Sequence, residues 1–233
     1  MLQNVNLDPI TPLAPLADGR PVYTSRRLDP AFNNIFELTS AGNSNYNALG
    51  IQVVKRMRRY AQFNVSYTWS HALDNAPETG VTGGSEQPQD SYNRRAEYGN
   101  SITDVRHVLN ASSILRWHEF QLATFFFARS GTTYDVRAGA DLNHDTVNND
   151  RPLYYGRNVG KGPASVQVDA RLSRSFRLEG LWPRARLEGF AESANLLNSP
   201  IPDSTNAFLN RKNFTILSWH EMRRIELGIR LFF

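Results

Sequence analysis

The stretch whose residues are best suited to chemistry is DLNHDTVNNDRP, residues 141–152. Asp141, Asn143 and Asp145 place side-chain oxygens at every second position, and Asp150 adds a further carboxylate. Hard cations such as Ca²⁺ prefer oxygen ligands of this kind. These four residues are therefore a candidate calcium site.

The same stretch departs from an EF-hand loop at two positions. Thr146 stands where that loop has glycine, and Pro152 stands where it has a bidentate glutamate. A solvated turn rich in Asx residues is the alternative interpretation, because Asn and Asp side chains hydrogen-bond to their own backbone in turns.

A second group of charges lies within YNRRAEYGNSITDVRH, residues 92–107, just before an expected strand. Its members are Arg94, Arg95, Glu97, Asp104 and Arg106. They could form a network at the rim or lumen of a barrel that contacts a ligand or lipid phosphates. They could equally be ion pairs that only orient the loop, and the sequence leaves both interpretations open.

We expect no catalytic activity. The five histidines show no HExxH spacing, and the chain contains no GxSxG elbow and no P-loop. Cysteine is absent, so thiolate metal sites are excluded. The net charge is only +4, and the basic run at 55–60 falls at a turn, so we expect no nucleic-acid partner.

The elements that must position these residues are strands. QFNVSYTWS places Phe63, Val65, Tyr67 and Trp69 on one face, opposite polar residues. Other alternating segments are expected at 46–56, 106–117, 119–129, 166–176, 184–198 and 223–233, with a weaker one at 32–39. The count is about eight.

The connections between these strands alternate in length. Those near 58–60, 117–119 and 179–183 are short, whereas those at 75–102, 131–163 and 199–220 are long and polar. This habit is typical of an antiparallel up-and-down outer-membrane barrel, with short periplasmic turns and long extracellular loops. The final residue, Phe233, would lie at the periplasmic end.

Strand alternation alone does not say whether the apolar face meets lipid or a protein core. No run of about 20 apolar residues is present, so a membrane-spanning helix is not expected. Segments of about ten residues and aromatic residues near strand ends, such as Tyr67, Trp69, Trp117 and Trp182, favour a lipid-facing wall. A small structural or adhesive barrel and a soluble β-sandwich binding module are the alternatives.

The last residues, ELGIRLFF, add a separate signal. Glu226, Gly228, Leu231 and Phe233 resemble the C-terminal sorting signal of bacterial outer-membrane barrels. The barrel-assembly machinery binds such a segment as an added edge strand, with alternate side chains giving specificity. We expect that machinery to be a partner.

Seven runs together resemble the C-terminal barrel portion of TonB-dependent receptors, in particular the Oar-like group. They are GNSNYNALGIQVVKR, FNVSYTWSHALDN, YNRRAEYGNSITDVRHVLNAS, DLNHDTVNNDRP, DARLSRSF, LEGFAESANLLNSP and the terminal strand. They occur in the family's order and span residues 40 to 233. The resemblance implies a bacterial outer-membrane barrel of roughly 22 strands with an N-terminal plug.

The chain departs from that family in lacking a plug, a TonB box and a signal-like start. We therefore expect an all-β, antiparallel up-and-down transmembrane segment of about eight strands, the C-terminal part of a larger barrel. Residues 1–30 would be an irregular stretch interior to a longer protein, and residues 31–233 the barrel segment. Expected partners are outer-membrane lipid and lipopolysaccharide, and the TonB system only through the missing plug.

Overall fold

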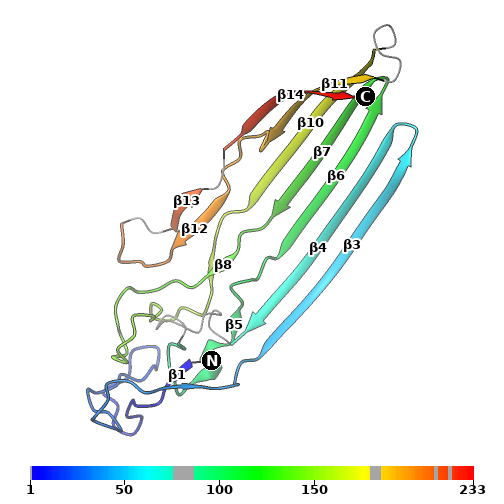
Figure 1. Ribbon diagram of the computed structural model, residues 1–233. Helices are drawn as coiled ribbons and strands as arrows, with labels where there is room; N and C mark the ends of the chain where they lie inside the picture. The colour runs from blue at the N-terminus through cyan, green and yellow to red at the C-terminus, as the bar shows by residue number, and fades with distance from the viewer. Residues whose placement is uncertain (1, 76–86, 179–184, 213–214, 220–221) are drawn as a thin grey trace.

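The computed structural model describes residues 2–75, 87–178, 185–212, 215–219 and 222–233. The described part is β-structure, with one short 3₁₀ helix and no α-helix. No helix in these residues is long and apolar enough to cross a membrane. Figure 1 shows one broad sheet with long strands, tight turns at one end and extended loops at the other.

The main sheet is an antiparallel meander of eight strands, in which neighbours in sequence are neighbours in space. In order they are β3 (Ser44–Arg58), β4 (Ala61–Asp74), β6 (His107–Trp117), β7 (Phe120–Arg129), β10 (Ser165–Arg177), β11 (Arg186–Ala194) and β14 (Arg224–Phe232), with the short β5 (Gly99–Asn100) paired to the end of β4. This confirms the all-β antiparallel class and seven of the expected segments.

The segment expected at 32–39 is placed differently. It contains β2 (Phe36–Leu38), which pairs with β1 (Leu2–Asn4) in a separate two-stranded sheet at the loop end. Predicting it as a wall strand was wrong, because its three residues, with no long alternating run, pair with β1 and not with a long strand of the wall. Two further small sheets pair β8 (Thr133–Tyr134) with β9 (Gly160–Lys161) and β12 (Pro202–Asn206) with β13 (Thr215–Trp219).

The two short connections that the structure describes are two-residue turns, at 59–60 and 118–119. Each described turn contains one residue in the left-handed region, Arg59 with φ 55° and His118 with φ 52°. The third short connection, at 179–183 with Trp182, lies outside the described residues, as do parts of the long connections at 75–102 and 199–220. The two described turns and the C-terminus thus lie at one end of the sheet, and the long loops lie at the other (Figure 1).

The strand register gives the sheet one apolar face. Directly paired residues share a face, and one row across five strands contains Val53, Val65, Ala111, Phe126 and Val168. The next row toward the loop end contains Ile51, Tyr67, Leu109, Ala128 and Val166. The next row toward the turn end is mixed, with Lys55, Phe63, Ser113, Thr124 and Ala170, and the row after it contains Leu115, Leu122, Leu172, Ala191 and Leu227. The expected apolar faces are confirmed.

The opposite face is polar with interspersed aromatic rings. Arg171 pairs with Glu188 at 3.0 Å and with Glu192 at 3.1 Å, and its guanidinium lies 3.9 Å from the centre of the Phe190 ring. On β14, Gly228 provides the space for that ring, since a Cβ there would lie 2.3 Å from it. A glycine in this strand therefore allows a phenylalanine to lie flat across it.

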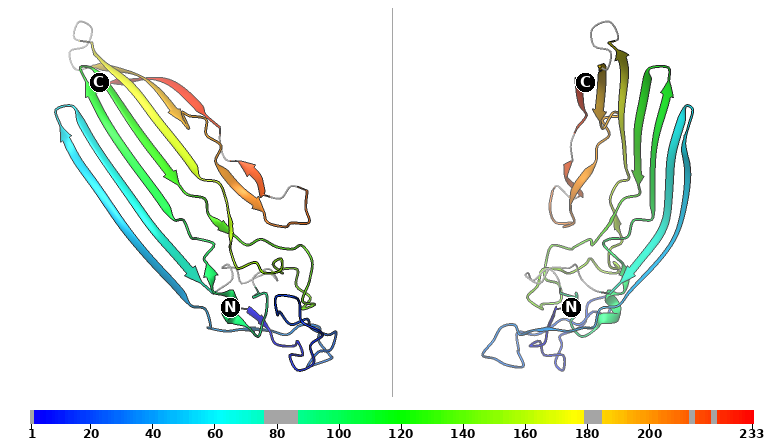
Figure 2. Two further views of the ribbon diagram at one scale, coloured as in Figure 1. Left: turned by 180° about the vertical axis from the view of Figure 1, so that it is seen from behind. Right: turned by 45° about the vertical axis from the view of Figure 1, so that its right-hand side comes forward.

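The apolar face is not covered by a second layer. Leu227, Ile229 and Trp117 are 80%, 77% and 68% exposed, and Figure 2 shows a single curved sheet. Within the described residues the buried hydrophobic side chains are Leu7, Val22, Tyr23, Ala72, Val136 and Ala185, none of which belongs to the apolar rows. The β-sandwich alternative is wrong, because no second sheet turns these rows into a core.

The sheet is open. Among the described residues, β3 and β14 each pair on one side only, and no backbone pairing joins them. Six antiparallel steps separate the two strands, so both run toward the turn end. Pairing β3 with β14 to close a barrel of seven long strands would therefore create a parallel seam.

The height of the apolar face matches a bilayer. Trp69 pairs with His107 at the start of β6, and Trp117 ends that strand. The ten residue steps between them span roughly 34 Å along the strand, or about 24–28 Å along the normal at the 35–45° tilt of outer-membrane strands. The apolar band of such barrels is about 25 Å tall.

Candidate functional site: the polar cluster at the loop end

The loop end contains a small folded unit built from three segments far apart in sequence. The N-terminal stretch packs against the connections at 87–106 and 131–163. The Tyr23 N–H donates to the Asn143 carbonyl oxygen at 2.8 Å, and the Tyr23 hydroxyl donates to Asp90 at 2.9 Å. Tyr23 and Leu7 are almost fully buried there. The expected irregular N-terminal stretch is irregular in backbone but has fixed contacts.

Glu97 and Arg151 form the central ion pair of this unit. The 3₁₀ helix η2 (Arg94–Glu97) ends at Glu97, whose two carboxylate oxygens accept from the guanidinium of Arg151 at 2.6 and 3.0 Å. The Gln89 N–H also donates to Glu97, at 3.0 Å. Both charged side chains are about 95% buried, with 5% and 6% exposure. Burial opposes the charge on Arg151, but its hydrogen bonds to Glu97 hold its pKa above the usual value.

Arg157 links this pair to the end of the sheet. Its guanidinium lies 3.9 Å from Glu97 and pairs with Asp74, the last residue of β4. A Cβ on Gly99, in the strand that pairs with Asp74, would lie 3.1 Å from the Arg157 carbonyl oxygen. The absence of a side chain at Gly99 therefore lets the loop backbone lie directly against the strand end.

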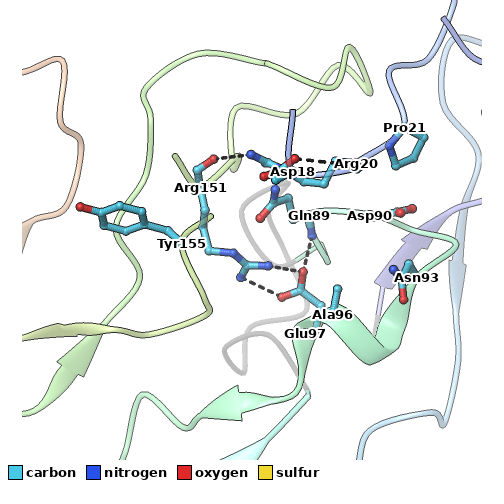
Figure 3. Close-up of a pocket in the computed structure, with 11 residues that line it drawn as sticks. Asp18, Arg20, Pro21, Gln89, Asp90, Asn93, Ala96, Glu97, Arg151 and Tyr155 are labelled. Carbon is cyan, nitrogen blue, oxygen red and sulfur yellow. Dashed lines mark hydrogen bonds and ion pairs between the residues drawn. The ribbon is translucent and has the colours of Figure 1, made fainter. Parts of the chain in front are cut away.

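A polar cavity of about 220 Å³ lies beside the Glu97–Arg151 pair (Figure 3). Its lining residues are Asp18, Gly19, Arg20, Pro21, Gln89, Asp90, Asn93, Ala96, Glu97, Arg151 and Tyr155. In Figure 3, Arg20 reaches Asp18 and the Arg151 carbonyl oxygen, at 2.8 and 3.0 Å. Charges of both signs line the cavity and are largely paired with each other, so the cavity is suited to a small polar ligand that carries little net charge.

The charged group expected at 92–107 separates into three parts in the structure. Glu97 joins Arg151 and Arg157, while Asp104 accepts from the Ala72 N–H at 2.8 Å and lies 3.4 Å from Arg106. The other two residues do not join either pair: Arg94 donates to Gln3, and Arg95 is exposed. The charged residues could be predicted from the sequence, but their partners could not.

The four candidate calcium residues do lie together. Asp141 accepts from the backbone N–H groups of Asp145 and Thr146 at 3.1 and 3.0 Å, and Asp150 accepts from that of Asn143 at 3.0 Å. The loop is thus a network of Asx turns. It is buried rather than solvated, with Asn143 and Asp145 1% exposed and Asp150 fully buried.

The electrostatics of this loop favour a cation or a proton. Burial, together with the nearby carboxylates of Asp141 and Asp150, raises the pKa of Asp145 to about 7. Burial also raises the pKa of Asp150, although two backbone N–H groups and Arg20 oppose the shift. In the described residues no three His, Cys, Asp or Glu side chains are arranged to hold a metal ion. Calcium binding stays a prediction.

The residues of the predicted C-terminal signal lie on the edge strand β14 or, for Phe233, directly after it. Leu231 is on the apolar face and 42% exposed, and Phe233 is 97% exposed. Glu226 pairs with Arg224 at 2.9 Å on the opposite face, where Gly228 also lies. One edge of β14 is free along its length in the described structure, which is the geometry that strand addition requires.

Arg151 also lies 3.6 Å from the carboxylate of Asp135. Sequence reasoning missed these partners that hold the loop end together, namely Arg20, Asp74, Asp135, Arg151 and Arg157. Arg151 directly follows the candidate calcium ligand Asp150, and this position next to a predicted site residue could have identified it. Arg20, Asp135 and Arg157 are single charged residues in irregular segments, and Asp74 ends a strand. Nothing in their spacing indicates a shared site.

A single-layer sheet with a bilayer-high apolar face is the geometry of a membrane wall, and a family comparison agrees. The family model described as the outer membrane beta barrel domain matches residues 1–161. The chain belongs to this family. No curated protein sequence matches it. The family places the protein in the bacterial outer membrane, as expected, and the match includes both the first strands of the wall and the loop-end unit.

Proposed function

We propose that the chain is a wall segment of a larger barrel of the TonB-dependent receptor type. In this proposal the loop-end unit forms part of the ligand-side surface, and β14 carries the assembly signal. The ordered runs that resemble Oar-like receptors support the finer family. The family match and the uncovered apolar face support the broader assignment, the wall of an outer-membrane barrel.

The larger barrel is proposed because the number of long strands in the wall is odd. Bacterial single-chain barrels have an even number of antiparallel strands, whereas this sheet has seven long ones whose two edges run in the same direction. Unpaired backbone groups are very costly in hydrocarbon, so both edges need partners. An odd number of further antiparallel strands satisfies both edges and avoids a parallel seam.

Cysteine pairs test this directly, because the chain has no native cysteine. Ile51→Cys is combined in turn with Leu227→Cys, Ile229→Cys and Leu231→Cys, and outer membranes are treated with a short bifunctional thiol reagent. We expect no cross-link within the chain. The control pair Ala191→Cys and Leu227→Cys, which face each other across β11 and β14, should cross-link efficiently. An efficient link between β3 and β14 would show self-closure and favour the small independent barrel.

The TonB-dependent part has its own test. TonB acts through a plug, so the genomic DNA in frame before residue 1 should encode a plug domain and an export signal. A stop codon and a separate promoter at that place would contradict the transporter proposal and leave the outer-membrane barrel intact.

A further inference from the structure

An apolar groove of about 360 Å³ lies on the outward face of the sheet near the turn end. Its lining comes from β6, β7 and β10, and consists of Leu115, Trp117, Phe120, Leu122 and Leu172. Trp117 and Leu172 are well exposed, at 68% and 47%. The groove is thus a hollow in the face that meets lipid, at the level where the apolar band ends.

An arginine that has no acidic partner among the described residues stands beside this groove. Arg174 pairs across the strands with Phe120, and its guanidinium carbon lies 4.9 Å from the centre of the Phe120 ring and 4.7 Å from that of Phe176. Its side chain is exposed, and in the described part of the chain it forms no ion pair with a carboxylate. Arg171, by contrast, lies on the polar face and is paired with two glutamates. The two rings hold the Arg174 guanidinium in place and leave its N–H groups free to donate hydrogen bonds.

A second arginine, Arg58, lies two strands beyond the β6 wall of the groove. Arg58 pairs with Ala61, which pairs with Leu115, so the three residues share the outward face. Arg58 is exposed at the tight turn between β3 and β4. The groove therefore has Arg174 at its β7–β10 wall and a more distant arginine, Arg58, two strands beyond β6, at the depth where Trp117 marks the level of the headgroups.

We propose that this groove and Arg174 bind an anionic glycerophospholipid. One acyl chain lies along Leu115, Leu122 and Leu172, and the headgroup phosphate accepts hydrogen bonds from Arg174. A planar guanidinium matches phosphate oxygens in two-point geometry, and a ring-held guanidinium loses little freedom on binding. The apolar lining favours a phosphate that carries a hydrocarbon chain over a free one. This inference rests on the outer-membrane barrel described above.

Quenching of tryptophan by brominated acyl chains tests the inference on the full chain in vesicles. The probe lipids are brominated phosphatidylglycerol, which is anionic, and brominated phosphatidylcholine, which is zwitterionic. The contribution of Trp117 is isolated by comparison with Trp117→Phe, because the chain contains four tryptophans. A cationic side chain near a membrane surface favours an anionic lipid by about fivefold, and we expect that preference at Trp117.

Matched variants assign the preference to one side chain. Arg174→Gln should remove it, and Arg174→Lys, which keeps the charge, should retain most of it. The control is Arg230→Gln, since Arg230 lies one row away on the polar face, over the Phe190 ring. That variant should keep the wild-type preference.

Each outcome separates this inference from the membrane assignment. Equal quenching by both lipids, or an unchanged preference in Arg174→Gln, overturns the phospholipid site alone. Absence of quenching of Trp117 by either lipid contradicts the membrane wall as well. Loss of the preference on adding inorganic phosphate, or stronger competition by lipopolysaccharide than by unlabelled phosphatidylglycerol, overturns the assignment to a glycerophospholipid.

Discussion

The sheet and the loop end of this protein bury opposite kinds of side chain. The sheet leaves its Val, Ile and Leu rows exposed, whereas the loop end buries Asn, Asp, Glu and Arg side chains and joins them by hydrogen bonds and ion pairs. In water this distribution would be unfavourable, because the apolar face gains nothing from folding. In a bilayer the lipid covers the apolar face, and the loop end must hold its shape through polar contacts. The two regions are therefore stabilised by different interactions, and a substitution can destabilise one without the other.

The largest effect is expected at the centre of the loop end. Glu97→Gln leaves Arg151 and Arg157 without their shared carboxylate in a buried site, which typically costs about 3–5 kcal/mol. Hydrogen exchange should show faster opening of residues 87–106 and 141–158, with little change in the strands. Glu226→Gln is the control, because the pair with Arg224 is exposed and is worth at most about 1 kcal/mol. Equal effects of the two variants would contradict the buried network.

The sheet should respond to charge on its apolar face. Val168 lies in the row nearest the middle of the wall, so Val168→Arg should cost about 2–4 kcal/mol when folding into lipid vesicles is measured in urea. Gln167→Arg places the same charge on the polar face, one residue away, and should be tolerated. If Val168→Arg folds as well as the wild type, the apolar face does not meet lipid.

The pH dependence should distinguish the regions further. Asp145 has a pKa of about 7 in the folded chain against an ordinary value of 3.8. The folded state therefore holds this proton more tightly than the unfolded state, and its stability should rise as pH falls from 8 through 7 toward 4. Limited proteolysis of the 141–152 loop should slow over that range, while the strands stay protected throughout.

Asp145→Asn is the matched variant for this prediction, because it removes the proton equilibrium and keeps the shape. It should flatten the pH dependence of cleavage. If the predicted calcium site exists, about 1 mM Ca²⁺ should protect the wild-type loop at pH 8 and leave Asp145→Asn unprotected. Equal cleavage with and without Ca²⁺ would count against the metal and not against the Asx-turn network.

The smallest effect on stability is expected at the last residue. Phe233 is 97% exposed, so its deletion should change the free energy of unfolding in detergent by less than about 0.5 kcal/mol. The yield of the shortened protein in the outer membrane should fall clearly, since the assembly machinery is expected to bind Phe233. Equal yields would contradict the predicted assembly signal, and deletion of Met1 serves as the control for loss of a terminal residue.

The wall could be predicted because period-two alternation depends on nearest neighbours in sequence. The runs around Val65, Leu109, Val168 and Ile229 each determine their own face, and their strand bounds agree with the structure within a few residues. The loop end could not be predicted in this way. Pairs such as Glu97 with Arg151 lie 54 positions apart and follow no period, so only the fold brings them together.

The segment at 32–39 shows a related limit. Its few apolar residues fit a strand, and the structure contains one, β2, but its partner is β1 at the start of the chain. The choice of partner depends on how the N-terminal stretch packs against Ser91 and Asn34, as the contacts of Asn4 show. Local pattern carries no information on that packing.

The edge of β3 that is unpaired in the described structure has a consequence for the chain before it inserts into the outer membrane. This strand has 15 residues, and its outward side chains, such as Ile51 and Val53, are more than half exposed. In an aqueous compartment, a long apolar edge strand of this kind can pair with other copies of the chain and cause aggregation. We therefore expect the polypeptide to need a holding chaperone before insertion, and shortage of such a chaperone should turn newly made chains into aggregates before they reach lipid.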